Sequence, residues 1–309
     1  MNKDDPKSIL LDKFHVDQAQ LIGSGMECEV YLYDHEKVLK VYNEMSDYRK
    51  QTVLKAFYSK IDSSDLSYEL PYIYDIYNEN GMVITIEKRM RGSNMQRLFS
   101  DMTVNEQTKM METYLNANLE LKSAKVESDI EGFVLFNENQ TSEAPDNWYF
   151  ALKEMVIRKK GELDCYFKRD VQHYNEKVNR LVAFLSSGYE GEYSLIHGDF
   201  YPGNLLANKH GKVTGLIDFG IMTMYGDHLF DIAIGWVCLD MYNELKANLY
   251  ERYLNIIIAT LSESVRKRLY IYVLIYSFLT ANLYSPKCED GHYQWCVKNL
   301  NNKGYWEAL

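Results

Sequence analysis

Residues 195–206 read Leu-Ile-His-Gly-Asp-Phe-Tyr-Pro-Gly-Asn-Leu-Leu, and residues 213–220 read Val-Thr-Gly-Leu-Ile-Asp-Phe-Gly. Within these two segments Asp199 precedes Asn204 by five residues and Asp218 by nineteen. We expect the rest of the chain to be organised around these two carboxylates and one amide. The competing interpretation is an ordinary β-hairpin with Asp and Asn at its turns.

The apolar residues around these positions predict a loop followed by a β-hairpin. Leu195 and Ile196 lead into the loop, and a strand begins at Leu205. Residues 208–211 form a turn, and residues 213–217 return as a second strand. Phosphoryl transfer from ATP needs a base for the hydroxyl proton and oxygen ligands that hold Mg²⁺ against the phosphates. The spacing His-x-Asp-x-x-x-x-Asn followed by Asp-Phe-Gly is that of the protein-kinase signature.

A glycine-containing turn near the N-terminus is a candidate phosphate-binding loop. Residues 21–31 predict a strand, a tight turn and a second strand. Gly23, Ser24 and Gly25 form the turn, where the two glycines let backbone N–H groups approach phosphate oxygens. Cys28 stands where protein-kinase loops have a third glycine. A plain hairpin turn would also explain Gly-x-Gly, so the interpretation depends on whether the next strand carries a lysine.

The strand predicted at residues 37–42 carries Lys40, the candidate for the lysine that neutralises the α- and β-phosphates. A solvated lysine on an edge strand is the alternative. In protein kinases a helix glutamate pairs with this lysine, but the helix predicted over about residues 47–61 has Gln51 and no glutamate. Three explanations remain open: Gln51 forms a hydrogen bond with Lys40, Glu44 moves in to pair with it, or Lys40 interacts mainly with the nucleotide.

An apolar strand over residues 82–88 runs into a polar hinge. In protein kinases the backbone of this hinge holds the adenine ring. Glu87 and Arg89 are therefore candidate nucleotide-binding residues by position. Because the backbone makes these contacts, the interpretation does not require particular side chains at the two positions.

These motifs resemble the aminoglycoside phosphotransferase family, which shares the fold of choline kinase and protein kinases. The residues that carry the resemblance are His197-Gly198-Asp199, Asn204, Ile217-Asp218-Phe219-Gly220 and the run Gly-Asp-His-Leu-Phe-Asp-Ile-Ala at 226–233. Gly198 stands where protein kinases usually carry Arg. The resemblance extends from about Leu21 to Asp240. A shorter similarity, at Gly132-Phe133 and Trp148-Tyr149-Phe150, is to the hygromycin phosphotransferase branch.

The resemblance implies a role for each matching residue. Asp199 would be the base that orients and deprotonates the acceptor hydroxyl, and Asn204 and Asp218 would be Mg²⁺ ligands. His197 would be structural, with its ring tying the catalytic loop to the chain near Asp218. Asp231 would brace the same loop from the helix that comes after it.

The predicted architecture is an α+β, bilobal, protein-kinase-like fold. A small antiparallel-sheet lobe spans residues 1–88, a hinge spans 89–92, and a larger helical lobe spans 93–309. ATP or GTP would bind with Mg²⁺ between the lobes. Helices are expected over about 105–122, 169–185, 228–242, 245–261 and 264–283, with an irregular polar insert at 127–146.

Composition is that of a globular enzyme, with 46% hydrophobic and 25% charged residues in 309. The five cysteines form no Cys-x-x-Cys pair, so neither a zinc site nor a disulfide framework is indicated. The N-terminal residues are acidic where a signal peptide is basic, and the most apolar stretch, residues 269–283, is short for a membrane span. We therefore expect a cytoplasmic protein with reduced thiols.

A net charge of −10 argues against a nucleic-acid partner and is compatible with a cationic acceptor. The resemblance favours an aminoglycoside-type antibiotic. The alternatives are a metabolic kinase for choline, a sugar or homoserine, a macrolide kinase, and a non-catalytic kinase-like binding protein. Carboxylates that could bind a cationic acceptor come after the catalytic hairpin in sequence: Asp240, Glu244, Glu289, Asp290 and Glu307.

Overall fold

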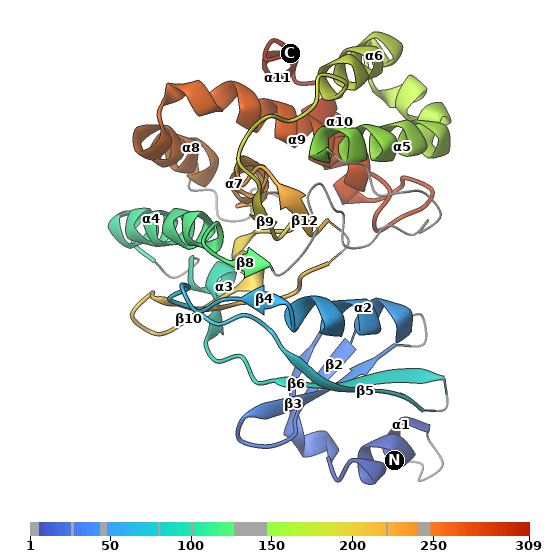
Figure 1. Cartoon of the computed structure of the whole chain (residues 1–309), viewed down its shortest axis with the longest axis vertical. Helices are drawn as coiled ribbons and strands as arrows, with labels where there is room; N and C mark the ends of the chain where they lie inside the picture. The colour runs from blue at the N-terminus through green and yellow to red at the C-terminus, as the bar shows by residue number, and fades with distance from the viewer. Residues whose placement is uncertain are drawn as a thin grey trace.

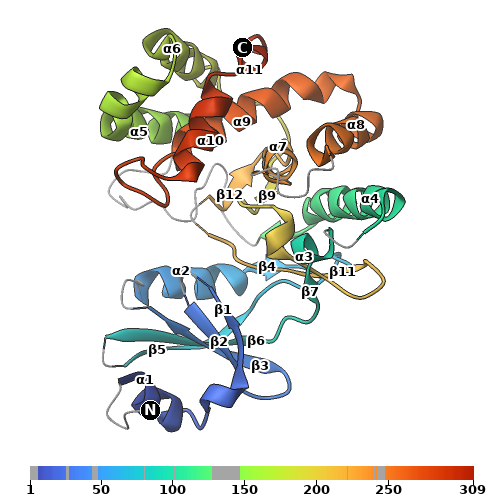
Figure 2. The same cartoon turned by 180° about the vertical axis from the view of Figure 1, so that it is seen from behind.

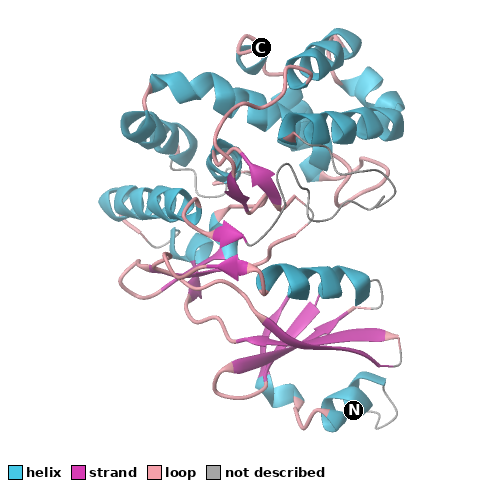
Figure 3. Ribbon diagram, viewed as in Figure 1, coloured by secondary structure: helices cyan, strands magenta, loops and turns pink. Residues whose placement is uncertain are grey.

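The structure, a computed structural model, describes residues 6–25, 28–43, 48–79, 81–99, 102–126, 147–220, 222–239, 241 and 248–309. A β-sheet with helices on both faces forms one end of the molecule, and a mostly helical body forms the other (Figures 1 and 3). The α+β class and the division into sheet and helical regions agree with the sequence prediction.

The five-stranded sheet is antiparallel throughout, in the order β1-β2-β3-β6-β5. Its strands are β1 (Leu21–Ser24), β2 (Cys28–Leu32), β3 (Lys37–Tyr42), β5 (Ile73–Glu79) and β6 (Met82–Lys88). The predicted strands at residues 37–42 and from residue 82 are thus confirmed as β3 and β6. In β3 the alternation of side chains sends Leu39 and Val41 to one face and Lys40 to the other.

A helix covers each face of this sheet (Figure 2). Helix α1 (Pro6–Lys13), which the sequence did not predict, buries Leu10 and Leu11 against strand residues that include Leu39 and Ile84. Helix α2 (Tyr48–Tyr58) lies on the opposite face, towards the helical body. Its buried residues Leu54, Phe57 and Tyr58 belong to the core of that body. The two parts of the molecule therefore share one core on the α2 side.

The connection from α2 to β5 also reaches the helical body. Strand β4 (Ile61–Asp62) pairs with β8 (Lys125–Val126), and Glu69 pairs in parallel with Gly215. The Tyr68 hydroxyl donates to the carbonyl of Ala117 at 2.8 Å. The two parts of the chain are consequently joined by this segment as well as by the hinge.

The helical body is built around α9, which packs against α5, α7, α10 and α11. Its helices are α3 (Met95–Phe99), α4 (Val104–Leu121), α5 (Trp148–Asp170), α6 (Tyr174–Leu185), α7 (Leu229–Cys238), α8 (Leu249–Leu261), α9 (Arg266–Thr280), α10 (Gly291–Leu300) and α11 (Lys303–Trp306). Single 3₁₀ turns occur at Gln18–Gln20, Pro202–Asn204 and Glu263–Val265. Among the described residues, no helix combines the length and hydrophobicity that a membrane crossing requires.

The predicted helices at about 105–122, 169–185 and 264–283 correspond to α4, α6 and α9. Helix α6 begins only at Tyr174, because residues up to Asp170 belong to α5, which the sequence did not predict. Helix α5 starts at the N-cap Asn147 and continues to Asp170. The chain then breaks at His173, whose φ of 55° is left-handed, before α6 begins. The insert predicted at 127–146 lies outside the described residues.

Two small β-structures frame the predicted catalytic loop. Strand β10 (Leu205–Ala207) pairs with β11 (Val213–Leu216) on one side and with β7 (Ser93–Asn94) on the other. Strand β9 (Ser194–Ile196) pairs with β12 (Met224–Gly226). The predicted hairpin is therefore present, and residues 197–204 form the loop between β9 and β10.

Candidate active site

The loop after β9 is held by a carboxylate from a helix later in the chain. The Asp231 side chain of α7 is buried and accepts hydrogen bonds from the backbone N–H groups of His197 and Gly198, at 2.6 and 2.8 Å. Burial raises the pKa of Asp231 to about 7, while the two N–H donors act in the opposite direction. Asp231 thus satisfies two buried backbone groups and sets the path of the loop.

Gly198 has a φ of +82°, in the left-handed region. A Cβ at this position would collide with the backbone carbonyl of Met222. Only glycine fits both the backbone conformation and the close approach. This explains why Gly198 occupies a position at which protein kinases usually carry Arg.

The ring of His197 links the loop to the strand that leads to Asp218. Its Nε2–H donates to the carbonyl of Ile217 at 2.8 Å, and its Nδ1 accepts the backbone N–H of Asp199 at 3.2 Å. The ring centroid lies 4.4 Å from that of Phe219. Burial lowers the pKa of His197 to about 4, so the ring is neutral at physiological pH. Both ring nitrogens are occupied, and the ring acts as a brace.

Asp199 lies in the loop with each carboxylate oxygen near a polar group. Its Oδ2 accepts the side-chain amide of Asn204 at 3.0 Å, and its Oδ1 is 3.5 Å from the hydroxyl of Tyr276 in α9. Burial raises the pKa of Asp199 to about 6, and the charge of Asp218 acts in the same direction. A carboxylate of this kind is ionised at neutral pH and is a stronger base than an exposed aspartate.

Asn204 and Asp218 offer oxygens that fit Mg²⁺. The Asn204 amide nitrogen is committed to the carbonyl and carboxylate of Asp199, which leaves its Oδ1 for a cation. Asp218 has an exposed side chain and a left-handed φ of 62°, and its charge acts on both Asp199 and Lys40. In the described parts of the chain no three His, Cys, Asp or Glu residues form a metal cluster. Further Mg²⁺ ligands would come from nucleotide phosphates and water.

Lys40 has a partner that the sequence interpretation did not identify. Its Nζ lies 2.9 Å from Oε2 of Glu87, at the end of β6. Gln51 of α2 instead accepts the hydroxyl of Tyr42, at 3.2 Å. The explanation that Gln51 bonds the lysine is therefore wrong for this structure, and Glu44 lies outside the described residues.

The glycine turn is open at its predicted phosphate-binding positions. Gly23 and Ser24 end β1, and the N–H of Gly25 donates to the carbonyl of Cys28 at 2.9 Å. A Cβ at Gly23 or Gly25 would meet its nearest atoms at 3.7 and 3.9 Å, which is ordinary contact. The fold itself does not require glycine here, so the requirement would come from a ligand that approaches the backbone. Residues 26–27, at the tip, lie outside the described residues.

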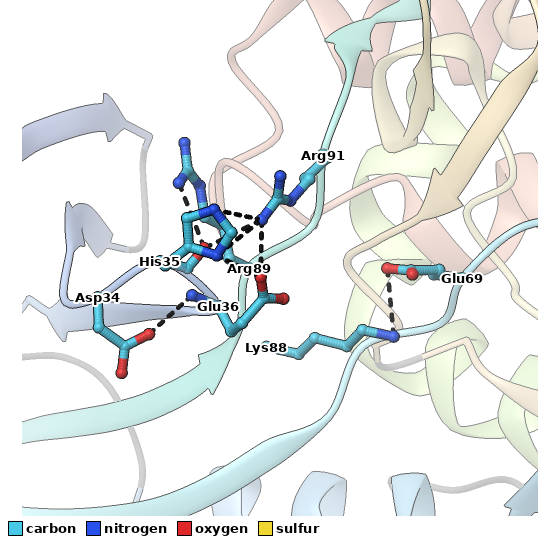
Figure 4. A network of polar contacts seen from close by, with 7 residues as sticks. All are labelled: Asp34, His35, Glu36, Glu69, Lys88, Arg89 and Arg91. Carbon is cyan, nitrogen blue, oxygen red and sulfur yellow. Dashed lines mark hydrogen bonds and ion pairs between the residues drawn. The ribbon is translucent and has the colours of Figure 1, made fainter.

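The hinge is anchored through its side chains to neighbouring segments (Figure 4). The N–H of Arg89 donates to the carbonyl of Glu36 at 2.8 Å, and Arg91 forms an ion pair with the carboxylate of Glu36 at 2.8 Å. Lys88 pairs with Glu69 at 3.2 Å. The Arg89 side chain is within 3.4 Å of the His35 carbonyl. The backbone N–H and the guanidinium of Arg89 thus each donate to the β2–β3 turn, and the contribution of Arg89 to nucleotide binding stays a prediction.

Aromatic side chains gather beside Asp199 on the helical side. Tyr276 contacts Asp199 directly, and its ring lies 6.3 Å from that of Trp295. Tyr201 interacts electrostatically with both Asp199 and Tyr284. This group could not be recognised from the sequence, because 26 tyrosines are spread along the chain.

The candidate acceptor carboxylates have different surroundings. Glu289 is exposed, and the neighbouring Asp290 caps α10 by accepting the N–H of Tyr293 at 2.7 Å. Glu307 is exposed after α11, at the end of the molecule farthest from the sheet (Figure 1). Asp240 and Glu244 lie outside the described residues, as does the Gly132-Phe133 pair. All five acceptor assignments stay predictions.

Comparison with known proteins places this geometry in a family. Residues 19–263 match the sequence model of a phosphotransferase enzyme family. The chain superposes on the gentamicin complex of APH(2")-IIa with a TM-score of 0.59 at 16% identity, covering 97% of this chain and 95% of that one.

Two further structures give the same result. ADP-bound aminoglycoside phosphotransferase APH(2'')-Ib matches with a TM-score of 0.58 at 15% identity, over 96% of both chains. Aminoglycoside phosphotransferase APH(3'')-Id from Streptomyces rimosus matches with a TM-score of 0.55 at 14% identity, over 89% of this chain and 98% of that one. At such low identity these likenesses establish the kinase-like fold, while the sequence match establishes membership. The chain belongs to the phosphotransferase enzyme family.

Proposed function

We propose that this protein is an ATP- or GTP-dependent O-phosphotransferase that transfers the γ-phosphoryl group to a hydroxyl of a small amino-sugar of the aminoglycoside type. The observation that carries the proposal is the assembly of Asp199, Asn204 and Asp218 by one loop and hairpin. The Asn204 amide holds the Asp199 carboxylate at 3.0 Å, and the Asn204 carbonyl accepts the N–H of Ile217, the residue before Asp218, at 2.9 Å. The next residue, Phe219, packs against Phe57 and Tyr58 of α2, which joins this hairpin to the sheet that carries Lys40. A base, a cation ligand and a phosphate-binding lysine are thus assembled from both parts of the molecule.

Asp199 is the proposed base. Its Oδ2 is held by the Asn204 amide, which leaves Oδ1, beside Tyr276, to accept a hydrogen bond from the acceptor hydroxyl. A pKa of about 6 keeps Asp199 ionised near neutral pH and able to take the proton as the oxygen attacks phosphorus. Asp231 and His197 keep the loop in place and do not touch the reacting atoms.

Lys40 and the turn at residues 23–25 are the proposed phosphate-binding groups. Asn204 and Asp218 would hold Mg²⁺, whose charge would offset that of the nucleotide phosphates. Lys40, on the β3 face towards α2, adds a fixed positive charge. Backbone N–H groups of the turn can reach phosphate oxygens without obstruction from a Cβ.

The choice of an amino-sugar is supported by charge and by structural neighbours. The chain carries a net charge of −10, which attracts polycations. Structures with the same fold contain gentamicin, streptomycin or kanamycin, and others contain ADP or GDP. Glu289 lies in the loop between α9 and α10 and Asp290 is the N-cap of α10, and both remain candidates for contacts with a cationic acceptor.

A kinase for a quaternary ammonium alcohol such as choline is the second candidate. Tyr276 contacts Asp199, Trp295 packs against Tyr276, and Tyr201 interacts electrostatically with Asp199. Such rings bind quaternary ammonium groups through cation–π contacts. An aromatic surface would serve an amino-sugar as well, so the acceptor must be identified by experiment.

The deciding experiment measures ATP and GTP consumption by the purified protein with a panel of acceptors. The panel contains aminoglycosides, macrolides, choline, neutral sugars and homoserine, with Asp199→Asn as the inactive control. Turnover that depends on an aminoglycoside and yields one phosphorylated product by mass spectrometry is expected. Turnover only with choline or a neutral sugar would show that the acceptor is not an amino-sugar. The absence of turnover with every hydroxyl compound would contradict the proposed phosphotransferase activity.

A further inference from the structure

The register of the sheet brings a lysine and a glutamate together on one face. Lys40 of β3 lies opposite Thr85 of β6, and Glu87 lies opposite Val38. Lys40 and Glu87 are therefore diagonal neighbours, close enough for long side chains to meet. The intervening Ile86 points to the other face, where α1 packs.

Both oxygens of Glu87 are occupied by strand residues. Oε2 lies 2.9 Å from the Lys40 ammonium. Oε1 accepts the hydroxyl of Thr85 at 2.6 Å and that of Tyr42 at 3.3 Å. The side chains of Glu87 and Lys40 are only 6% and 21% exposed. The carboxylate is thus held from three directions by β3 and β6, and its orientation is fixed.

Charge balance makes this pairing important to the lysine. Burial by itself would lower the pKa of Lys40, but the carboxylate of Glu87, with smaller contributions from Tyr42, Asp218 and Cys28, raises it well above its ordinary value. Lys40 therefore remains an ammonium ion in the folded protein. A buried pair that loses one partner leaves an uncompensated charge.

Helix α2 carries no carboxylate that could take this role. The sequence Tyr48–Tyr58 contains no Asp or Glu. Its buried Gln51 reaches Glu87 only through the hydroxyl of Tyr42. The helix is instead engaged through Phe57 and Tyr58, whose rings pack against Phe219.

We propose that Glu87 is the positioning residue for Lys40, so that the charge partner of the phosphate-binding lysine is built into the sheet and is not supplied by α2. The inference rests on the proposed function for the role of Lys40 towards phosphates. The pairing of Lys40 with Glu87 can be tested independently of that function.

The first experiment measures the reactivity of Lys40 without any nucleotide. Wild type and Glu87→Gln are treated with an amine acylating reagent at pH 8.5, and modification of Lys40 is followed by peptide mass spectrometry. Loss of the carboxylate should increase the neutral amine fraction and the Lys40 acylation rate by at least ~10-fold, the effect of one pKa unit. Glu69→Gln is the matched control. It removes the carboxylate that pairs with Lys88, the residue next to Glu87 on β6, and this pair is more exposed. The acylation rate of Lys40 should not change in this variant.

The second experiment measures the affinity and steady-state kinetics for nucleotide and Mg²⁺. Glu87→Gln should lower kcat/KM for nucleotide by about 10²-fold, since misplacement of a catalytic-site charge by about 1 Å has effects of this size. Glu69→Gln should change kcat/KM by less than ~3-fold, within the range of a surface contact. Gln51→Ala should have a much smaller effect than Glu87→Gln, because Gln51 reaches Glu87 only through the Tyr42 hydroxyl. Glu87→Asp keeps the charge on a shorter side chain, so its kcat/KM should fall between those of wild type and Glu87→Gln. If Glu87→Gln does not fold, Glu87→Asp replaces it in both experiments.

The outcomes separate the two proposals. Unchanged Lys40 acylation in Glu87→Gln would overturn the pairing and leave the phosphotransferase proposal standing. Faster acylation with unchanged nucleotide affinity and kinetics would mean that Lys40 does not act on phosphates, which contradicts both the positioning role and that part of the proposed function. A large kinetic effect of Gln51→Ala would place the partner on α2 and overturn the inference.

Discussion

The carboxylate of Asp231 lies 2.8 Å from the backbone nitrogen of Gly198, and this bond joins α7 to the catalytic loop. The loop therefore takes its shape from a helix that lies beyond it in sequence. The Gly198 N–H donates this bond from a left-handed backbone conformation that lies close against Met222. The conformation of the loop and the residue type at position 198 are consequently coupled.

Gly198→Ala should destabilise the protein by at least about 1–3 kcal/mol, the range for a non-glycine residue held in strained backbone. The collision with Met222 adds to this value. Thermal unfolding compared with Gly161→Ala is the measurement, because a Cβ at Gly161, inside α5, meets nothing within 4 Å. The control should unfold at or slightly above the wild-type temperature. Equal melting temperatures for Gly198→Ala and wild type would show that the close approach is absent.

Asp199→Asn should reduce kcat by ~10²–10⁴-fold, as expected for loss of a positioned general base. Nucleotide affinity should stay close to wild type, because the proposed role of Asp199 is towards the acceptor hydroxyl and not towards the nucleotide. Steady-state kinetics give the first quantity and titration calorimetry the second. A variant that keeps more than about a tenth of wild-type kcat would remove Asp199 from the role of base.

Asp218→Ala should lose the Mg²⁺-dependent part of nucleotide binding. Its exposed carboxylate is one of two protein oxygen ligands in the proposed site. Calorimetric titrations with nucleotide in the presence and absence of Mg²⁺ measure this contribution. Mg²⁺-nucleotide affinity and activity equal to those of wild type would contradict the metal role.

His197 should make stability dependent on pH. Its pKa is about 4 in the folded protein and about 6.5 when unfolded, so the unfolded state binds more protons between these values. The stabilisation is complete above pH 6.5 and is lost as the pH falls to 4, by about 3 kcal/mol in total. Asp199 and Asp231 have raised pKa values and act in the opposite sense, so the comparison must be with a variant.

The variant is His197→Gln, whose amide can still donate to the carbonyl of Ile217. The difference in the free energy of unfolding between wild type and His197→Gln, measured with urea, should fall as the pH decreases from 7 to 4. A difference that does not change with pH would mean that His197 titrates normally in the folded protein.

The KM for an aminoglycoside should rise with added KCl more steeply than the KM for ATP. Exposed carboxylates such as Glu289 attract a polycation through charges that are screened beyond ~8 Å at physiological ionic strength. In the proposed site, nucleotide would be held at shorter range by backbone groups and Mg²⁺. Initial-rate measurements over a salt series, with choline chloride excluded as the salt, provide the test. Parallel rises for both substrates would argue against an acceptor site built from exposed carboxylates.

The sequence by itself determined the catalytic hairpin, because the groups involved are close in the chain. Asp199, Asn204 and Asp218 are brought together by the 3₁₀ turn after the loop and by the pairing of Leu205 with Leu216. Turn residues and strand periodicity specify such local structure. Strand β3 with Lys40 was predictable for the same reason.

Only the tertiary structure decided which residues support these groups. Glu87 meets Lys40 through the register between β3 and β6, and Tyr276 meets Asp199 across 77 residues of sequence by the packing of α9. Neither register nor helix packing leaves a local signal in the chain, because both depend on how distant apolar surfaces are buried together. The sequence shows that α2 contains no glutamate. That Glu87 of β6 takes its place beside Lys40 could be recognised only in the folded sheet.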